Sequence, residues 1–236
     1  HHPDFTVDWN HPRRDDENAH ALNEGRDMAR YREYLHGQVR ELLTEYGDEL
    51  DDVTLGGIAD GVFLGGYETS ASMLALGTYL LTATPEAARM LRSGDSDEVD
   101  RVVEELLRYL CVVQLAFLRF AKTDVTVGGV EIKEGDAVGV SLLAANRDPV
   151  LGDDMDTFDP TREPARHLAF GWGMHRCVGA ELARMELRTA LRMLAERYPD
   201  LAMAADIDEL DFRKLSAVYG VERLPVHLRG HATASD

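Results

Sequence analysis

Apolar residues recur at helical spacing along most of this chain. Over about residues 21–46 they return every three or four positions, which predicts an amphipathic helix. Residues 54–83 are apolar on most faces, which predicts a long helix buried through the centre of a domain. Three further helices are predicted: one that opens at Pro85, one over 97–110, and one from just after Cys177 to about Tyr198.

Strand-like alternation is limited to one region. Val125 to Val127 and Val130 to Ile132 flank the pair Gly128-Gly129, and this arrangement predicts a β-hairpin. A second turn at 134–136 leads to another short strand. The chain is therefore expected to be α+β and mainly α.

The remaining segments lack a clear period. Residues 146–169 are predicted to be irregular, and residues 199–229 to form short strands and turns. Residues 1–20 are polar and predict a flexible N-terminal segment, and 231–236 predict a short tail. One domain is expected over 21–230.

Composition narrows the class of protein. The 236 residues are 44% hydrophobic, which suffices for a sizeable core. The net charge of −18 repels nucleic acid and anionic membranes. The sequence shows no apolar run long enough to span a membrane and no signal peptide. Its two cysteines do not form a C-x-x-C pair, so they indicate neither a disulfide scaffold nor a zinc site. A cytoplasmic protein without nucleic-acid or membrane partners is expected.

The chemistry is concentrated around Cys177, in the run F-G-W-G-M-H-R-C-V-G that starts at Phe170 and precedes a predicted helix. Glycines let the backbone approach a large flat ligand or adopt positive φ. Backbone N–H groups and a helix N-terminus favour a thiolate, and a thiolate aimed out of a tight loop can bind haem iron. The alternative is a buried, inert cysteine.

The pattern F-x-x-G-x-x-x-C-x-G resembles the haem-binding signature of cytochrome P450s. Other segments resemble the family in the family's order: Gly65-Gly66-Tyr67-Glu68-Thr69, Glu105-x-x-Arg108, and Arg119-x-Ala121. Between the hairpin and the cysteine, three short runs look like the family's bacterial soluble members: Asn146-Arg147-Asp148-Pro149, Phe158-Asp159-Pro160, and His167-Leu168-Ala169-Phe170.

This resemblance implies a haem b cofactor and a role for each matched residue. Cys177 would be the axial ligand of the iron, and Arg119 and His175 would pair with a haem propionate. The residues expected to bind the cofactor are Cys177, His175, Arg119, Phe170, Gly171, Gly179 and Gly66. Thr69 and Glu68 would be catalytic, because they would deliver protons on the oxygen-binding side.

Each of these motifs also has a plainer interpretation. Glu105 and Arg108 would brace the core, but Glu–Arg pairs at this spacing also occur on exposed helices. A Gly-Gly pair followed by Thr69 is an ordinary helix feature, and Arg119 could be a solvated charge at a strand edge. Residues 112–117 and 218–220 would face an apolar substrate pocket, or would be core.

The implied function is a haem-thiolate monooxygenase that inserts one oxygen atom of O2 into a small apolar organic substrate. A ferredoxin-type electron donor would dock near Arg176, Arg184 and Arg188. Two alternatives are a haem-free P450-like auxiliary that activates a partner enzyme, and a thiolate haem enzyme that uses peroxide or catalyses dehydration or isomerisation.

Length sets this chain apart from the family. Whole P450s have roughly 400 residues, so about 160 would be missing before the first matched helix. A truncated P450 fold is expected: the helical haem-binding half with small β hairpins. The missing part would impair catalysis more than haem ligation, and the apolar face it leaves would favour homo-oligomers.

Overall fold

The computed structural model describes residue 44 and residues 51–214 and 216–228. The predicted segments 1–20 and 231–236 lie outside the described residues, as does the helix over 21–46 apart from Thr44, which is helical. The chain divides into two compact units, residues 1–65 and 66–236, and each is described by itself. None of the helices in the described ranges is both long and apolar enough to cross a membrane.

Helix α3 (Asp52–Ala83) confirms the long predicted helix. The carboxylate of Asp51 accepts a hydrogen bond from the backbone N–H of Thr54 at 2.7 Å and caps its first turn. The expectation of burial along its whole length is wrong. Several apolar side chains in the first half, such as Val53 and Leu64, are exposed, whereas Ala59 and Phe63 in the same half are buried.

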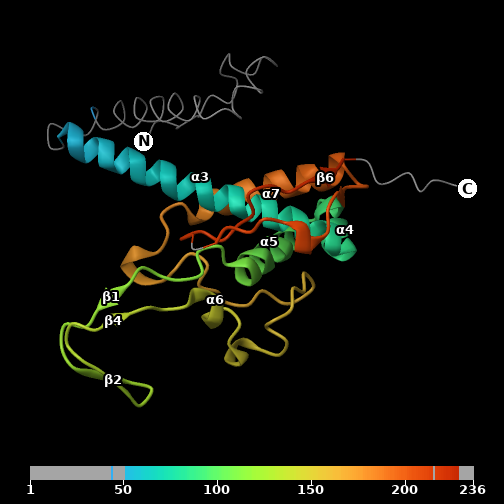
Figure 1. The fold of residues 1–236 in the computed structure, drawn as a ribbon. Helices are drawn as coiled ribbons and strands as arrows, with labels where there is room; N and C mark the ends of the chain where they lie inside the picture. The colour runs from blue at the N-terminus through green and yellow to red at the C-terminus, as the bar shows by residue number, and fades with distance from the viewer. Residues whose placement is uncertain (1–43, 45–50, 215, 229–236) are drawn as a thin grey trace, which may run out of the picture. The chain divides into compact units, whose positions relative to one another are not determined.

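The core of the second unit is helical. The second half of α3 packs with α4 (Pro85–Ser93), α5 (Ser96–Leu110) and α7 (Ala180–Arg197), as Figure 1 shows. These helices begin and end close to the predicted positions. Asp95 caps α5 by accepting from the N–H groups of Asp97 and Glu98. The largest fully buried apolar side chains come from α4, α5 and α7: Met90, Leu91, Val102, Val103, Leu106, Leu187 and Leu191.

The predicted hairpin is present with the expected register. Strands β2 (Val125–Val127) and β3 (Val130–Ile132) are antiparallel, and Val127 lies opposite Val130. Gly128 and Gly129 have φ of 59° and 82°, so both central residues of the turn need the left-handed region that glycine adopts easily.

The unit contains two other small antiparallel sheets. Strand β1 (Arg119–Phe120) pairs with β4 (Ala137–Val138), and β5 (Ala202–Met203) pairs with β6 (Val226–His227). The segments between these elements contain short helical turns: α6 (Leu142–Ala145), η2 (Pro149–Leu151), η3 (Gly173–His175) and η4 (Ile207–Glu209). The mainly α fold class with small hairpins is confirmed.

The C-terminal segment makes one very close approach to α3. Phe212 and Val221 pair as an isolated bridge, and the N–H of Arg213 donates to the carbonyl of Gly220 at 2.9 Å. A Cβ added to Gly220 would lie 2.6 Å from Oγ and 3.2 Å from Cβ of the buried Ser72. The segment can reach α3 here only because residue 220 has no side chain.

We therefore expect Gly220→Ala to destabilise the protein by about 1–3 kcal/mol, the usual cost of overpacking a close contact. Ser72→Ala in the same chain should recover part of that loss, because it removes the nearest atom. Urea unfolding of the two single variants and the double variant measures this coupling. Additive losses would show that the close contact is not the cause.

Candidate functional site

The loop before α7 presents Cys177 to solvent. The N–H of Cys177 donates to the carbonyl of Phe170 at 2.9 Å and closes the loop. Gly171 and Gly173 have φ of 70° and 81°, which side chains rarely tolerate. Helix α7 begins three residues after the cysteine. The thiol is exposed, so the interpretation of Cys177 as a buried, inert residue is wrong.

Cys111 has the opposite character. It is buried, and burial raises the pKa of its thiol to about 11. Its Sγ lies 3.5 Å from the carbonyl oxygen of Val113. The two cysteines therefore differ clearly, and only Cys177 is placed to bind a ligand.

Large apolar side chains on the cysteine loop and in the segment after α5 are exposed to solvent. Trp172 and Val178 on the cysteine loop are 81% and 98% exposed, and Phe117 in the segment after α5 is 92% exposed. Exposed apolar side chains of this size typically mark a surface for a ligand or partner. A Cβ added to Gly66 would have no described atom within 4 Å.

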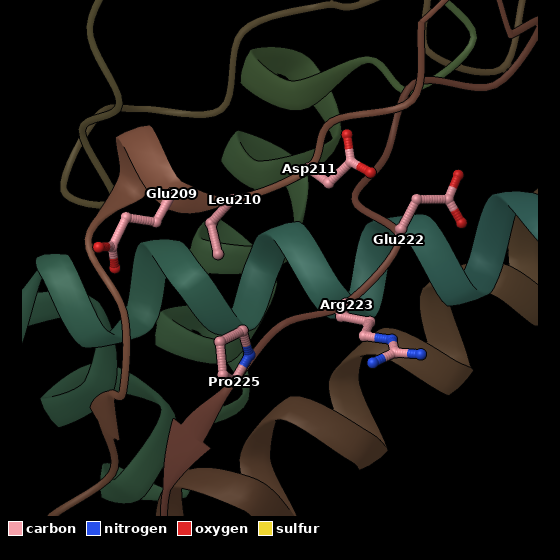
Figure 2. Close-up of a pocket in the computed structure, with 6 residues that line it drawn as sticks. All are labelled: Glu209, Leu210, Asp211, Glu222, Arg223 and Pro225. Carbon is pink, nitrogen blue, oxygen red and sulfur yellow. The ribbon is translucent and has the colours of Figure 1, made fainter.

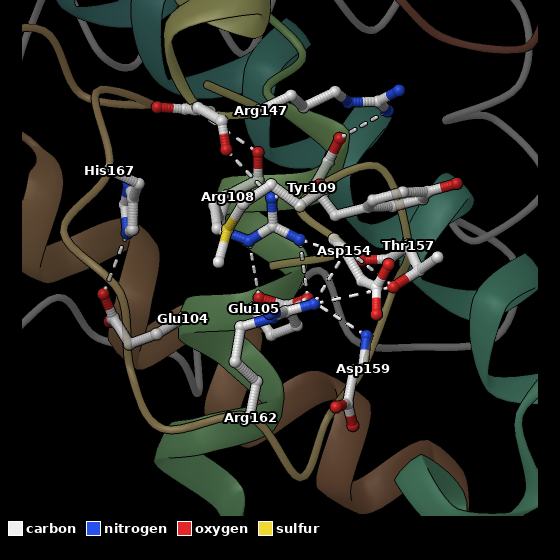
Figure 3. Close-up of polar contacts among 12 residues, drawn as sticks. Glu104, Glu105, Arg108, Tyr109, Arg147, Asp154, Thr157, Asp159, Arg162 and His167 are labelled. Atoms are coloured by element: carbon white, nitrogen blue, oxygen red, sulfur yellow. Dashed lines mark hydrogen bonds and ion pairs between the residues drawn. The ribbon is translucent and has the colours of Figure 1, made fainter. Parts of the chain in front are cut away.

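A buried ion pair lies behind the loop. Glu105 and Arg108 are 5% and 1% exposed, and two hydrogen bonds of 2.7 Å join the carboxylate and the guanidinium. The other donors of Arg108 reach the backbone carbonyls of Asn146, Met155 and Thr157, as Figure 3 shows. This pair is therefore not a surface pair, and its bracing role follows from how many segments it joins.

Sequence reasoning missed a third charged member of this cluster. Arg162 has its Nε 3.6 Å from the Oε1 of Glu105, and the N–H of Asp159 donates to the same oxygen at 3.0 Å. Figure 3 shows both beside the pair. The Phe158-Asp159-Pro160 run was the available signal, because it ends two residues before Arg162.

On α3, the predicted proton donors have a partner that the sequence did not suggest. Glu68 accepts from Nη1 of Arg213 at 3.0 Å, and Arg213 also lies 3.4 Å from Oγ of Ser72 and 3.5 Å from Glu222. Thr69 is the next residue of the helix and is half-buried. No local pattern marks Arg213, because the contact joins residues 145 positions apart.

Comparison with known proteins places these features in a family. The sequence profile described as "Cytochrome P450" matches residues 14–203. The chain is 43% identical over 190 residues to cytochrome P450 165B3 of Amycolatopsis orientalis, and 40% identical over 183 residues to 6-deoxyerythronolide B hydroxylase of Saccharopolyspora erythraea. These matches cover 80% and 78% of this chain.

Solved structures agree. The crystal structure of GfsF superposes with a TM-score of 0.76 at 38% identity, over 83% of this chain and 54% of that one. StaH, a P450 from glycopeptide antibiotic A47934 biosynthesis, also gives 0.76 at 38% identity, over 90% and 59%. The chain belongs to the cytochrome P450 family. It spans about half the length of the curated relatives it matches, 48% and 44% for the two named above.

The family's cofactor is haem b, and the residues of this P450 fit such a group. Cys177 supplies an exposed soft ligand, the neighbouring apolar side chains suit a flat macrocycle, and Gly66 leaves open space. Arg119 and His175 are exposed donors suited to carboxylates. Arg119 donates to the carbonyl of Phe117 at 3.0 Å, and among the described residues no hydrogen bond joins it to His175.

The three arginines expected to attract an electron donor are already paired. Arg176 and Arg184 both contact Glu181, at 3.4 Å and 2.9 Å, and Arg188 pairs with Asp100. Arg184 also binds Glu104. The positive charge of this surface is therefore partly neutralised within the P450 itself.

A groove of about 550 Å³ lies near the C-terminal strands. Figure 2 shows its lining, which includes the carboxylates of Glu209, Asp211 and Glu222 and the guanidinium of Arg223. This polar lining differs from the apolar pocket expected around 112–117 and 218–220. It gives no support for a substrate site at this place.

Removal of one member of the buried pair should be costly. We expect Glu105→Ala to lower the free energy of unfolding by about 3–5 kcal/mol, because Arg108 would keep a buried charge without its carboxylate. Urea unfolding measures the loss. Glu86→Ala, which removes an exposed carboxylate that pairs with Arg89, is the control and should have little effect. Equal losses in the two variants would contradict the bracing role.

Proposed function

We propose that this chain is the haem-binding part of a haem-thiolate monooxygenase, which inserts one oxygen atom of O2 into a small apolar organic substrate. The observation that carries the proposal is the exposed Cys177 thiol on a glycine-shaped loop, surrounded by exposed apolar side chains. The buried Glu105–Arg108 pair behind it supports the same interpretation. Membership of the P450 family gives the chemistry its class.

In this proposal Cys177 Sγ binds the iron, and the guanidinium of Arg119 and the imidazole of His175 orient the group through its carboxylates. Phe170, Gly171, Gly179 and Gly66 would form the surface that holds it. When bound, a thiolate-ligated haem supplies activation of O2, because the thiolate pushes electron density toward the iron. Exclusion of water from the group needs a cover that these residues do not provide.

Proton delivery is assigned to α3. The hydroxyl of Thr69 would hold a proton at its Oγ1, and the carboxylate of Glu68 would resupply it from solvent. Glu68 is half-buried, so it can reach both environments. Arg213 holds the Glu68 carboxylate at 3.0 Å and thereby limits where it can point.

The substrate class rests on apolar surface and on relatives. Leu115 and Phe117 follow α5 and are exposed, which suits an apolar substrate. A relative is named for hydroxylation of 6-deoxyerythronolide B, and we infer a comparable organic substrate class for this P450. A ferredoxin-type donor would dock beside the cysteine loop, where Arg176 is about half exposed.

The haem-free auxiliary is not favoured. Such proteins typically lose the cysteine ligand, whereas Cys177 is present here and exposed. A cytoplasmic location and self-association through apolar surface stay predictions of the sequence.

The decisive experiment is spectroscopic. Chain reconstituted with haem, reduced and exposed to carbon monoxide should show the thiolate band at about 450 nm, and Cys177→Ala should abolish it. Cys111→Ala is the matched control and should keep the band, since its thiol is buried. An unchanged band in Cys177→Ala, or no haem uptake by the parent chain, would overturn the proposed function.

A further inference from the structure

Glu104 of α5 links two segments that meet at the start of the cysteine loop. Its Oε1 accepts from Nε of Arg184 at 2.6 Å, and its Oε2 accepts from Nη2 of the same guanidinium at 3.1 Å. The Oε2 also lies 3.0 Å from Nε2 of His167. One carboxylate thus binds both α7 and the residue that opens the loop. Figure 3 shows Glu104 facing His167, apart from the Glu105 cluster.

His167 is held at both ring nitrogens. Its side chain is 5% exposed, and Nδ1 accepts from the N–H of Ala169 at 3.2 Å. With Nδ1 as acceptor, the neutral ring carries its proton on Nε2 and donates it to Glu104. The imidazole therefore binds the backbone N–H of Ala169 through one nitrogen and the Glu104 carboxylate of α5 through the other.

Arg184 reaches the loop by a second route. Its Cζ lies 4.8 Å from the ring centroid of Phe170, over the ring face. Phe170 is the residue whose carbonyl accepts from the N–H of Cys177. The guanidinium thus connects the Glu104 carboxylate to the residue that closes the cysteine loop.

We propose that Glu104, His167 and Arg184 form a clamp that holds residues 167–170 against α5 and α7, and that these three are positioning residues for Cys177. The inference rests on the proposed function, because it takes Cys177 as the iron ligand. The clamp gives Arg184 a structural role at the loop, in addition to its contact with Glu181. None of the three clamp residues touches the cysteine itself, so they act through the loop.

The clamp should show in the pH dependence of stability. Burial opposes ionisation of Glu104, but hydrogen bonds from His167 and Arg184 outweigh it and lower its pKa from 4.5 to about 2. The titratable and charged groups around it are the His167 imidazole, the Arg184 guanidinium and, through Arg184, the Glu181 carboxylate. A lowered pKa contributes stability that is complete above about pH 4.5 and is lost as the pH falls toward 2.

Urea unfolding of the parent chain and of Glu104→Gln should therefore give a stability difference at pH 7 that shrinks below about pH 4.5. The comparison between two chains cancels the titration of the other carboxylates. A difference that stays constant down to pH 3 would contradict an ionised Glu104 in the clamp.

Hydrogen exchange tests the clamp without haem. Five amides at 168–177 donate within the loop or to its anchors: those of Leu168, Ala169, Gly171, Arg176 and Cys177. In Glu104→Gln we expect these amides to exchange about tenfold faster. Local opening of the loop would no longer have to break a charged hydrogen bond, so the loop would open more often. Arg184→Lys should act in the same direction, because lysine keeps the charge but not the two-pronged contact.

Asp100→Asn is the matched control. It removes another α5 carboxylate that pairs with an arginine of α7, one turn earlier and away from the loop. It should leave exchange at 168–177 unchanged, and α4 (Pro85–Ser93) should stay protected in every variant. Equal effects of Asp100→Asn and Glu104→Gln, loss of protection in α4, or no change in Glu104→Gln would each overturn the proposal.

The haem-loaded chain supplies a second readout. Glu104→Gln should lower the share of the carbon monoxide complex that absorbs at about 450 nm, while Asp100→Asn should not. If the parent chain takes up no haem, the proposed function fails, whereas the exchange measurement still decides whether the clamp exists.

Discussion

The buried contact between Glu105 and Arg108 organises the second unit. Arg108 is almost fully enclosed, and a guanidinium without partners in such a place would be very unfavourable. Its donors are satisfied by one carboxylate and by three backbone carbonyls between Asn146 and Thr157. A segment with little regular structure is therefore held in one path by a single side chain.

Hydrogen bonds connect this ion pair to the segment that leads into the cysteine loop. Asn146, which accepts from Arg108 through its carbonyl, also accepts from the N–H of Leu168 through its side chain at 2.6 Å. Leu168 begins the run that leads to Cys177. The residue next to the buried pair, Glu104, ties the same run from the other side. Polar contacts made by α5 therefore hold the run that carries the thiol, since the loop has little buried apolar surface of its own.

The cysteine loop and the segment after α5 show the opposite balance. Trp172, Val178 and Phe117 are apolar and exposed, while Arg119 and His175 are polar and exposed. Exposed apolar side chains of this size typically mark a surface that binds a ligand or another protein.

Much of this was readable in the sequence. Helical spacing gave α4, α5 and α7, the Gly128-Gly129 pair gave the hairpin, and the cysteine motif gave the family, because these signals are local. Burial of Glu105 and Arg108 was decided only by tertiary structure. The same is true of the contacts of Arg162 and Arg213 with distant carboxylates, and of the exposure of apolar side chains such as Leu64 in the first half of α3. Those features depend on which segments meet in space, and a charged residue looks the same in a sequence whether it meets water or a buried partner.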